Sequence, residues 1–175
     1  MKKSKSNVAV CLSVAALIGA LLTPALSLAA SRFQPMPVQA QVNANCNFTS
    51  SNTMDFLSYD PTGANATAPL GGTVVVSVRC TRGATVTIGI DTGANAANAP
   101  AGSTRAMKLG TNYLGYDFYQ DSTYATLWTN SGPGLYSFVS PGNAPNPVTV
   151  FGRVPGGQDV SAGLYQDTVQ VTVNY

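Results

Sequence analysis

Apolar and polar residues alternate along most of this chain, in short runs separated by residues that favour turns. In residues 72–80, one face of an extended chain would carry Val74, Val76, Val78 and Cys80. In residues 84–91 the same face is formed by Val86, Ile88 and Ile90, and in residues 164–175 by Val169, Val171, Val173 and Tyr175. A period of two residues predicts β-strands with one buried face, and it points Cys80 into the core.

Five more stretches have the composition of strands: residues 54–59, 105–109, 113–120, 124–129 and 148–154. Residues 91–103 and 130–147 are rich in Gly, Pro, Asn and Ser, so we expect them to form surface loops. Beyond the first apolar run, no window has the 3.6-residue period of a helix. The pattern therefore predicts an all-β protein, an antiparallel β-sandwich.

The first residues have the pattern of an export signal. Three lysines among the first five residues precede an apolar run at residues 8–22, and Ser27 and Ala29 have the spacing that a signal peptidase recognises. We predict a signal peptide over residues 1–29, cleaved after Ala29. A membrane anchor fits less well, because the run is shorter than the ~20 apolar residues that a span needs, and Pro24 follows it.

The composition argues against most enzyme and nucleic-acid functions. Without the three leading lysines, six Lys and Arg remain against seven Asp, a net charge of −1, so no basic surface for nucleic acid is expected. The chain has no His and no Glu, which removes His-dependent triads, His-based zinc sites and glycosidase pairs with Glu. Asp117 and Asp121 are expected to be solvated and apart. We predict no catalytic residue, no cofactor and no metal.

Two of the three cysteines remain after the signal peptide, because Cys11 lies within it. An even pair in an exported chain favours a disulfide, here between Cys46 and Cys80. A bond that closes a loop of 34 residues would stabilise the fold by about 3–4 kcal/mol in the chain-entropy account.

Between the signal peptide and Cys46, residues 36–46 read MPVQAQVNANC. Their alternation predicts a strand whose apolar face carries Met36, Val38, Ala40, Val42 and Ala44. Pro37 has no N–H to donate to a neighbouring strand, so firm pairing is expected from Val38 onward. The pattern alone does not say to which sheet this strand belongs.

Several longer motifs carry a family resemblance: VVVSVRCTRG at 74–83, RAM at 105–107, LGYDFYQD at 114–121, LW at 127–128 and VFGRVPGGQDVSAGLYQDTVQVTVNY at 150–175. They resemble the spore coat protein U domain family, which includes the Csu-type, or archaic, chaperone-usher pilins. The positions that match the family pattern are Gly152, Arg153, Pro155, Gln158, Gly163, Tyr165 and Asp167. The chain departs from that pattern at Leu57 and Thr129, where the family often has glycine.

The resemblance implies an incomplete immunoglobulin-like sandwich at residues 46–175 that lacks its last strand, preceded by a donor-strand extension at residues 30–45. A periplasmic chaperone would fill the resulting groove. At an outer-membrane usher, the extension of the next subunit would replace it by strand addition. The donor side chains would be Met36, Val38, Ala40, Val42 and Ala44, and one groove wall would be Val169, Val171, Val173 and Tyr175.

On this interpretation the chain is a non-catalytic fimbrial subunit, exported through the periplasm to the cell surface, where fimbriae support adhesion and biofilm formation. Its partners would be neighbouring pilin subunits of the same or a related kind, the chaperone and the usher, with no nucleic acid and no membrane-embedded part after signal removal. One alternative is a protective spore or cell coat protein of the same family. Another is a secreted monomeric binding module whose own extension closes its own groove.

Overall fold

The structure is a computed structural model that describes residues 29–50 and 52–175. The signal peptide expected at residues 1–29 therefore lies outside the described residues, except for Ala29. Contacts divide the chain into residues 1–40 and 41–175. In the first unit, residues 29–40 have no regular secondary structure and exposed side chains. Among the described residues, no helix has the length and apolar character needed to cross a membrane.

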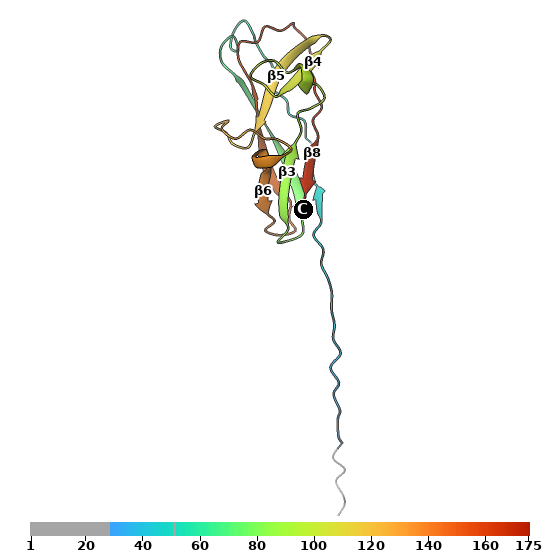
Figure 1. Cartoon of the computed structure of the whole chain (residues 1–175). Helices are drawn as coiled ribbons and strands as arrows, with labels where there is room; N and C mark the ends of the chain where they lie inside the picture. Colours follow the sequence, from blue (N-terminus) through green and yellow to red (C-terminus); the bar gives the residue numbers. More distant parts are fainter. Residues whose placement is uncertain (1–28, 51) are drawn as a thin grey trace, which may run out of the picture. The chain divides into compact units, whose positions relative to one another are not determined.

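Residues 41–175 form two antiparallel sheets (Figure 1). The larger sheet has the strand order β1-β2-β7-β5-β4, with bounds β1 Cys46–Phe48, β2 Leu70–Cys80, β7 Asn146–Val154, β5 Asn112–Tyr119 and β4 Arg105–Leu109. The smaller sheet has the order β6-β3-β8, with bounds β6 Tyr136–Val139, β3 Thr85–Ile90 and β8 Val171–Asn174. Two short 3₁₀ helices, Ala96–Asn98 and Gly132–Gly134, lie in the loops. The predicted all-β sandwich class is confirmed.

The apolar faces predicted for β2 and β3 form the centre of the core. Val78 and Cys80 are buried, and so are Val86, Ile88 and Ile90 on the opposing strand. Trp128 packs among them with no exposed surface, and its indole N–H donates to the carbonyl of Ile88 at 2.9 Å. The buried aromatic ring therefore has its one polar group satisfied inside the sandwich.

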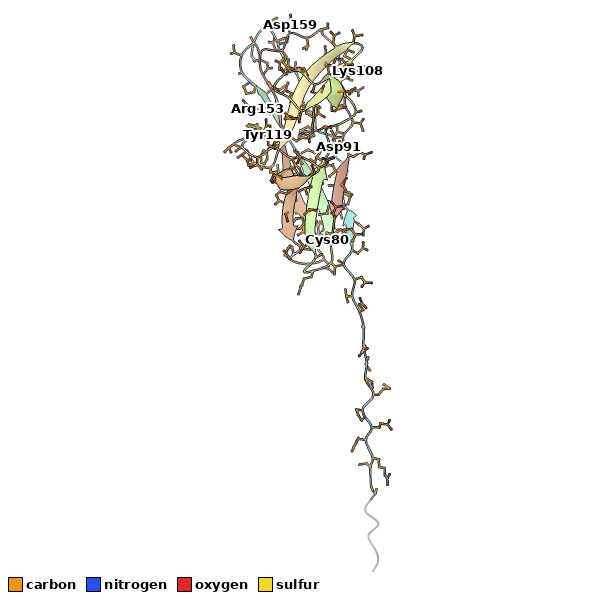
Figure 2. The ribbon with its side chains drawn as sticks, in the orientation of Figure 1. Cys80, Asp91, Lys108, Tyr119, Arg153 and Asp159 are labelled. Atoms are coloured by element: carbon orange, nitrogen blue, oxygen red, sulfur yellow. A yellow bond between two sulfur atoms is a disulfide. The ribbon has the colours of Figure 1, made fainter. Side chains whose placement is uncertain are left out.

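Cys46 and Cys80 form the predicted disulfide. The two residues lie directly opposite each other in the β1–β2 ladder, with 4.1 Å between their Cα atoms. Figure 2 places Cys80 at the end of the sandwich where β2 turns into β3. The short strand β1 is thus joined covalently to β2, which has 11 residues and is the longest of the described strands.

Two predicted strands are wrong, because the backbone at these positions hydrogen-bonds to side chains. Within residues 54–59 no strand forms: Leu57 adopts φ +59°, and its N–H donates to the Asp55 carboxylate at 2.8 Å. Within residues 124–129 no named strand forms either: the Asp121 carboxylate accepts the N–H groups of Ala125 and Thr126, and the only bridge of this segment pairs Leu127 with Tyr119. Short polar side chains that bind nearby backbone compete with sheet ladders in this way.

Three boundaries also differ from the prediction. The expected loop at residues 130–147 contains β6 and the first residues of β7. The expected strand at 164–175 is regular only in β8, although Gln166 forms an isolated bridge with Lys108. In the 36–46 run, only Cys46 belongs to a strand, and that strand, β1, continues to Phe48.

Candidate functional site

The smaller sheet is open along one edge of β8. This strand pairs with β3 alone, with Val171 opposite Ile90 and Val173 opposite Ile88. The N–H of Asp91 donates to the carbonyl of Gln170, so the backbone groups of Gln170 point toward β3. Because backbone groups alternate in direction along an antiparallel strand, those of Val169, Val171 and Val173 point away from β3. Among the described strands, none pairs with this second edge.

The side chains along the same strand are only partly covered. Val169, Val171 and Val173 pack against the core but remain half-buried, whereas Ile88 and Ile90 on the neighbouring strand are buried. Tyr175, the last member of the predicted groove wall, is 55% exposed. An apolar row that faces a core and is still accessible indicates that the sandwich has room for one more strand at this edge.

A cleft of about 890 Å³ continues this open edge along the chain segment that precedes β8. One wall consists of residues 52–59 and the other of residues 160–169. The apolar side chains between them are Leu70, Met107, Leu114, Tyr116 and Phe118. The cleft therefore has apolar side chains between two walls of mixed polarity, and it lies next to a strand whose edge is unpaired.

The first wall is held by an aromatic ring on a pair of glycines. Gly72 and Gly152 are directly opposite each other in the β2–β7 ladder. A Cβ at Gly152 would lie 2.7 Å from the Phe56 ring, so any larger residue there would displace the ring from its present place against the sheet. The Tyr59 hydroxyl also holds this wall: it donates a hydrogen bond to the carbonyl of Pro155 and accepts one from the N–H of Gln158, both at 3.0 Å.

The second wall is held by two carboxylates. Asp167 accepts hydrogen bonds from the Tyr116 hydroxyl at 2.7 Å, from the N–H of Ala94 and from the side-chain amide of Asn95. Burial, followed by the hydrogen bond to Asp167, raises the pKa of the Tyr116 phenol above its usual range, so it stays a donor. On the neighbouring turn, Asp91 accepts the N–H of Gln170 at 2.9 Å. These bonds tie the segment that leads into β8 to the end of β3.

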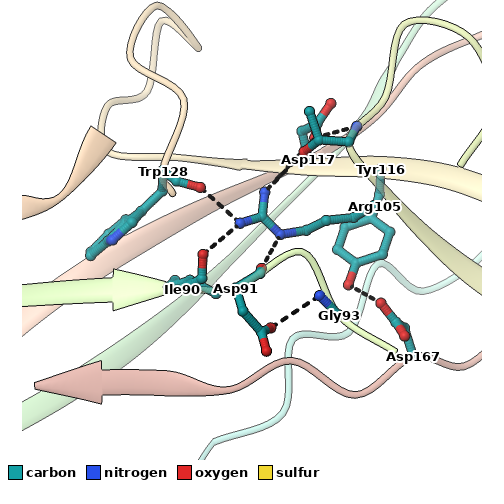
Figure 3. A network of polar contacts seen from close by, with 9 residues as sticks. Ile90, Asp91, Gly93, Arg105, Tyr116, Asp117, Trp128 and Asp167 are labelled. Carbon is teal, nitrogen blue, oxygen red and sulfur yellow. Dashed lines mark hydrogen bonds and ion pairs between the residues drawn. The ribbon is translucent and has the colours of Figure 1, made fainter. Parts of the chain in front are cut away.

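Arg105 organises this region from inside the core (Figure 3). Its side chain is completely buried and donates to the main-chain carbonyls of Asp91 at 2.8 Å, Ile90 at 2.9 Å and Trp128 at 2.8 Å. Asp117 lies 3.8 Å from the guanidinium. Burial lowers the pKa of Arg105, and the nearby phenol of Tyr116 and carboxylate of Asp117 oppose that shift.

The expectation that Asp117 is solvated is wrong. Its side chain is buried, accepts a hydrogen bond from the N–H of Thr104 at 2.9 Å and bonds the Thr104 hydroxyl. Asp121 is half-buried and separate from Asp117, and it accepts hydrogen bonds from the N–H groups of Thr123 and Ala125 in its own loop. Sequence reasoning missed Arg105 as well. The sequence did contain one indication that Arg105 points inward. It lies two residues before Met107 on β4, so both side chains lie on the same, inward face of the strand.

The predicted donor residues occupy a segment without strand structure. Met36, Val38 and Val42 are 80% exposed or more, and Ala40 and Ala44 are exposed too. Of the predicted wall residues, Val169 lines the cleft, and Val171 and Val173 continue the same half-buried apolar row along β8. No group of three or more His, Cys, Asp or Glu side chains in the described part of the chain is placed to hold a metal ion. The site presents a half-buried apolar row and the free backbone groups of one edge of β8.

Comparison with known proteins gives a consistent set of similarities. The sequence model of the Spore Coat Protein U domain matches residues 32–172. Protein U of Myxococcus xanthus is 39% identical over 149 residues, which cover 78% of this chain and 80% of that protein. The fold is similar, with a TM-score of 0.51 and 25% identity, to a chain in the crystal structure of the CsuC–CsuE chaperone–tip adhesion subunit pre-assembly complex from archaic chaperone-usher Csu pili of Acinetobacter baumannii. That match covers 77% of this chain and 40% of the other.

Proposed function

Because the chain belongs to the Spore Coat Protein U domain family, we propose that it is a structural subunit of a surface fibre assembled by strand addition. In this proposal residues 46–175 form the acceptor domain and residues 30–45 the donor extension. The extension of one copy pairs with the free edge of β8 in the next copy and fills the adjoining cleft. The observation that carries the proposal is the unpaired edge of β8 beside that apolar cleft.

The pattern of the extension supports this pairing. A strand that enters the cleft needs one apolar face toward the core, and the even positions from Met36 to Ala44 supply it. Burying Met36, Val38 and Val42 would contribute roughly 1.5–3 kcal/mol each, thus about 5–9 kcal/mol together, and each backbone hydrogen bond about 1 kcal/mol net. Ordering the extension costs about 1–2 kcal/mol per residue, so binding depends on the whole apolar set.

The open edge also supports the predicted assembly partners. An accessible strand edge above an apolar cleft is an aggregation hazard, and a newly exported subunit needs a protein that covers it. A periplasmic chaperone fits that need, and the similar solved structure is described as a chaperone–subunit complex. In the proposed pathway, an outer-membrane usher exchanges the chaperone for the extension of the next subunit.

Such pairing gives an open fibre. Donor and acceptor surfaces lie on different parts of the chain, so each contact is head-to-tail and leaves a free surface at both ends of the polymer. The neighbouring subunits are other copies of this chain or related pilins. We place the fibre at the cell surface, where it supports adhesion and biofilm formation, and we assign the chain no catalytic role.

A protective coat protein is the second candidate, favoured by the similarity to Protein U and by the description of the family. It would use the same strand addition but form a layer on cells or spores instead of projecting fibres. Immunogold electron microscopy with an antibody to residues 46–175 separates these two outcomes. Labelled filaments support the fimbrial subunit, and a continuous labelled layer supports the coat protein.

Deletion of residues 30–44 tests strand addition itself. A fibre subunit without them would still be recovered with its chaperone and would still accept a synthetic peptide of residues 30–45, but would form no polymer. A monomer that closes its own groove would instead lose its fold. Unfolding of the deleted chain, together with a full chain that stays monomeric without a chaperone, would therefore refute addition between copies.

A pair of substitutions on β8 tests the acceptor surface. Val171→Asp places a charge on the half-buried face beside the cleft, and Thr172→Asp places the same charge on the exposed face of the same strand. We expect Val171→Asp to abolish co-purification with the chaperone and Thr172→Asp to leave it unchanged. Equal recovery of both variants would contradict the assignment of this surface.

A further inference from the structure

The exposed charges of residues 41–175 are divided between the two ends of the sandwich. Arg79 is exposed in the last turn of β2, and Arg82 is exposed in the turn between β2 and β3. Within the described residues, neither guanidinium forms an ion pair with a carboxylate. No Asp side chain lies in the β2–β3 turn, the β6–β7 turn or β1, which together form this end of the domain. We call this surface, defined by Arg79 and Arg82, the basic end.

The opposite end carries carboxylates. Figure 2 places Asp159 at the far end of the sandwich from Cys80. Asp60 belongs to the neighbouring turn, which the Tyr59 hydroxyl joins to the carbonyl of Pro155 and the N–H of Gln158. Both Asp side chains are exposed, and the cations nearest to this end are Lys108 and Arg153, which lies opposite Gly71 beside the start of β2. We call the surface defined by Asp60 and Asp159 the acidic end.

These carboxylates are accessible and charged. Asp60 accepts hydrogen bonds from the Thr62 hydroxyl and from the N–H groups of Thr62 and Gly63, which hold its pKa below the usual range. Asp159 lines a hollow of about 250 Å³ between residues 61–66 and 157–160. Its carboxylate forms no hydrogen bond or ion pair with the rest of the described chain. The acidic end therefore offers a recess with an unpaired negative charge at its border.

The charges at the two ends are too far apart to form ion pairs within one domain. Strand β2 has 11 residues and runs from the acidic end at Leu70 to the basic end at Cys80. At about 3.3 Å per residue, this separates the ends by roughly 35 Å. The Debye length in physiological salt is about 8 Å, so attraction across the domain is screened. Complementary charges at opposite ends are matched when two copies stack end to end.

The proposed strand addition brings the ends together. The extension leaves the domain at Asn45, at the basic end, where Asn45 also accepts a hydrogen bond from the Tyr175 hydroxyl. In a growing fibre, the next domain must lie at the end that the acceptor's own extension does not occupy, which is the acidic end. The cleft reaches this end through Pro61 and Val160.

The connection between the two domains is short. Ala44 is the last apolar residue of the donor face, and Cys46 is already fixed in β1 of the donor domain. Two Cα steps span at most about 7 Å. With Ala44 in the groove of one copy, the basic end of the donor domain therefore faces the acidic end of the acceptor within reach of long side chains.

From this, and resting on the proposed function, we propose that the basic end of one subunit docks onto the acidic end of the next, with Arg82 of the donor domain directed at Asp159 and Asp60 of the acceptor. The partner of this surface is a second copy of the same chain. The contact orients the incoming subunit and accelerates strand addition, because complementary charges raise the rate of encounter and select one docking orientation.

Charge reversal and its compensation test this contact in the exported, disulfide-bonded full chain. Fibre growth is followed by light scattering in 50 mM and 500 mM NaCl. We expect Arg82→Asp and Asp159→Arg each to slow growth about tenfold at low salt, in line with the lower range of electrostatic steering. The double variant R82D/D159R, which restores opposite charges between copies, should grow within about threefold of the wild-type rate. Thr73→Asp, an added carboxylate on the sheet face between the ends, is the control and should have no effect.

A synthetic peptide of residues 30–45 separates this contact from the groove. The peptide has the donor strand but no domain, so it should block fibre growth of the wild type and of Arg82→Asp at the same concentration. If it blocks neither, strand addition itself fails. If it blocks both but charge reversal has no effect, or the double variant grows no faster than the single ones, the docking contact is refuted while strand addition stands.

Discussion

Replacement of Arg105 by methionine tests whether one buried guanidinium holds the acceptor region together. Arg105 donates to three carbonyls at the end of β3 and next to Trp128, and the same segment anchors the wall that leads into β8. Methionine fills much of the space but leaves these carbonyls, and the buried Asp117, without their cationic partner. Breaking a buried, hydrogen-bonded ion pair in this way costs about 3–5 kcal/mol of unfolding free energy.

Urea unfolding measures this loss, with the fluorescence of Trp128 as a local probe, because it is the single tryptophan of the chain and contacts Arg105 through its carbonyl. With a slope of about 2 kcal/mol per molar urea, the midpoint of the peptide-complemented domain should fall by roughly 1.5–2.5 M. Far-ultraviolet circular dichroism should give the same midpoint. Arg105→Lys is the matched control, because it keeps the charge but cannot reach three carbonyls at once. Its urea midpoint should lie between those of the wild type and Arg105→Met. A midpoint for Arg105→Met within 0.5 M of wild type, about 1 kcal/mol, would refute the role given to the guanidinium.

Three further predictions concern other parts of the domain. Reduction of the Cys46–Cys80 disulfide should lower stability by about 3–4 kcal/mol, seen as a fall in the midpoint of thermal unfolding of about 10 °C, whereas an unchanged midpoint would contradict a stabilising bond. Tyr116→Phe removes one donor to Asp167, so it should lower the free energy of unfolding in urea by about 1.5–2 kcal/mol and weaken binding of the 30–45 peptide. Unchanged peptide binding would show that this hydrogen bond does not support the groove. Hydrogen bonds from Thr123, Ala125 and Thr126 lower the pKa of Asp121, so the contribution of this group is complete above the unfolded pKa of about 3.9 and is lost only as the pH falls through the lower folded pKa. Amide NMR shifts of these three residues should therefore stay constant from pH 7 to 4. A transition above pH 4 would contradict the lowered pKa of Asp121.

The sequence predicts the strands whose alternation reflects burial on one face. β2 and β3 could be predicted in this way, because apolar residues occupy every second position in each strand. Val78 on β2 and Val86 and Ile88 on β3 all face the core. β6 was hidden, since its two inward residues, Tyr136 and Phe138, stand in a segment dominated by loop-forming residues. Its place in the sheet is decided by pairing with β3, a long-range contact that local composition does not encode.

The candidate site divides in the same way. The apolar row of Val169, Val171 and Val173 follows from the alternation alone, but the open edge beside it depends on which strands are neighbours. Arg105 and Asp117 escaped prediction because charged residues are rarely buried, and their burial depends on carbonyl and hydroxyl partners from two separate connections, β3–β4 and β5–β6. At Leu57, a hydrogen bond from the main-chain N–H to the Asp55 carboxylate replaced the strand that the composition favoured.

The disulfide at the start of β1 has a mechanical consequence for a subunit that is pulled through its extension. A force on Asn45 would meet a strand of three residues, whose ladder with β2 has only three residue pairs. The bond between Cys46 and Cys80 bypasses that short ladder and passes the load to β2, which has nine residue pairs with β7. All nine pairs must then slide past each other together before β2 can leave the sheet. The bond thus moves the tension from a three-pair ladder to a nine-pair ladder, and a chain of such domains is held together through β2 and β7.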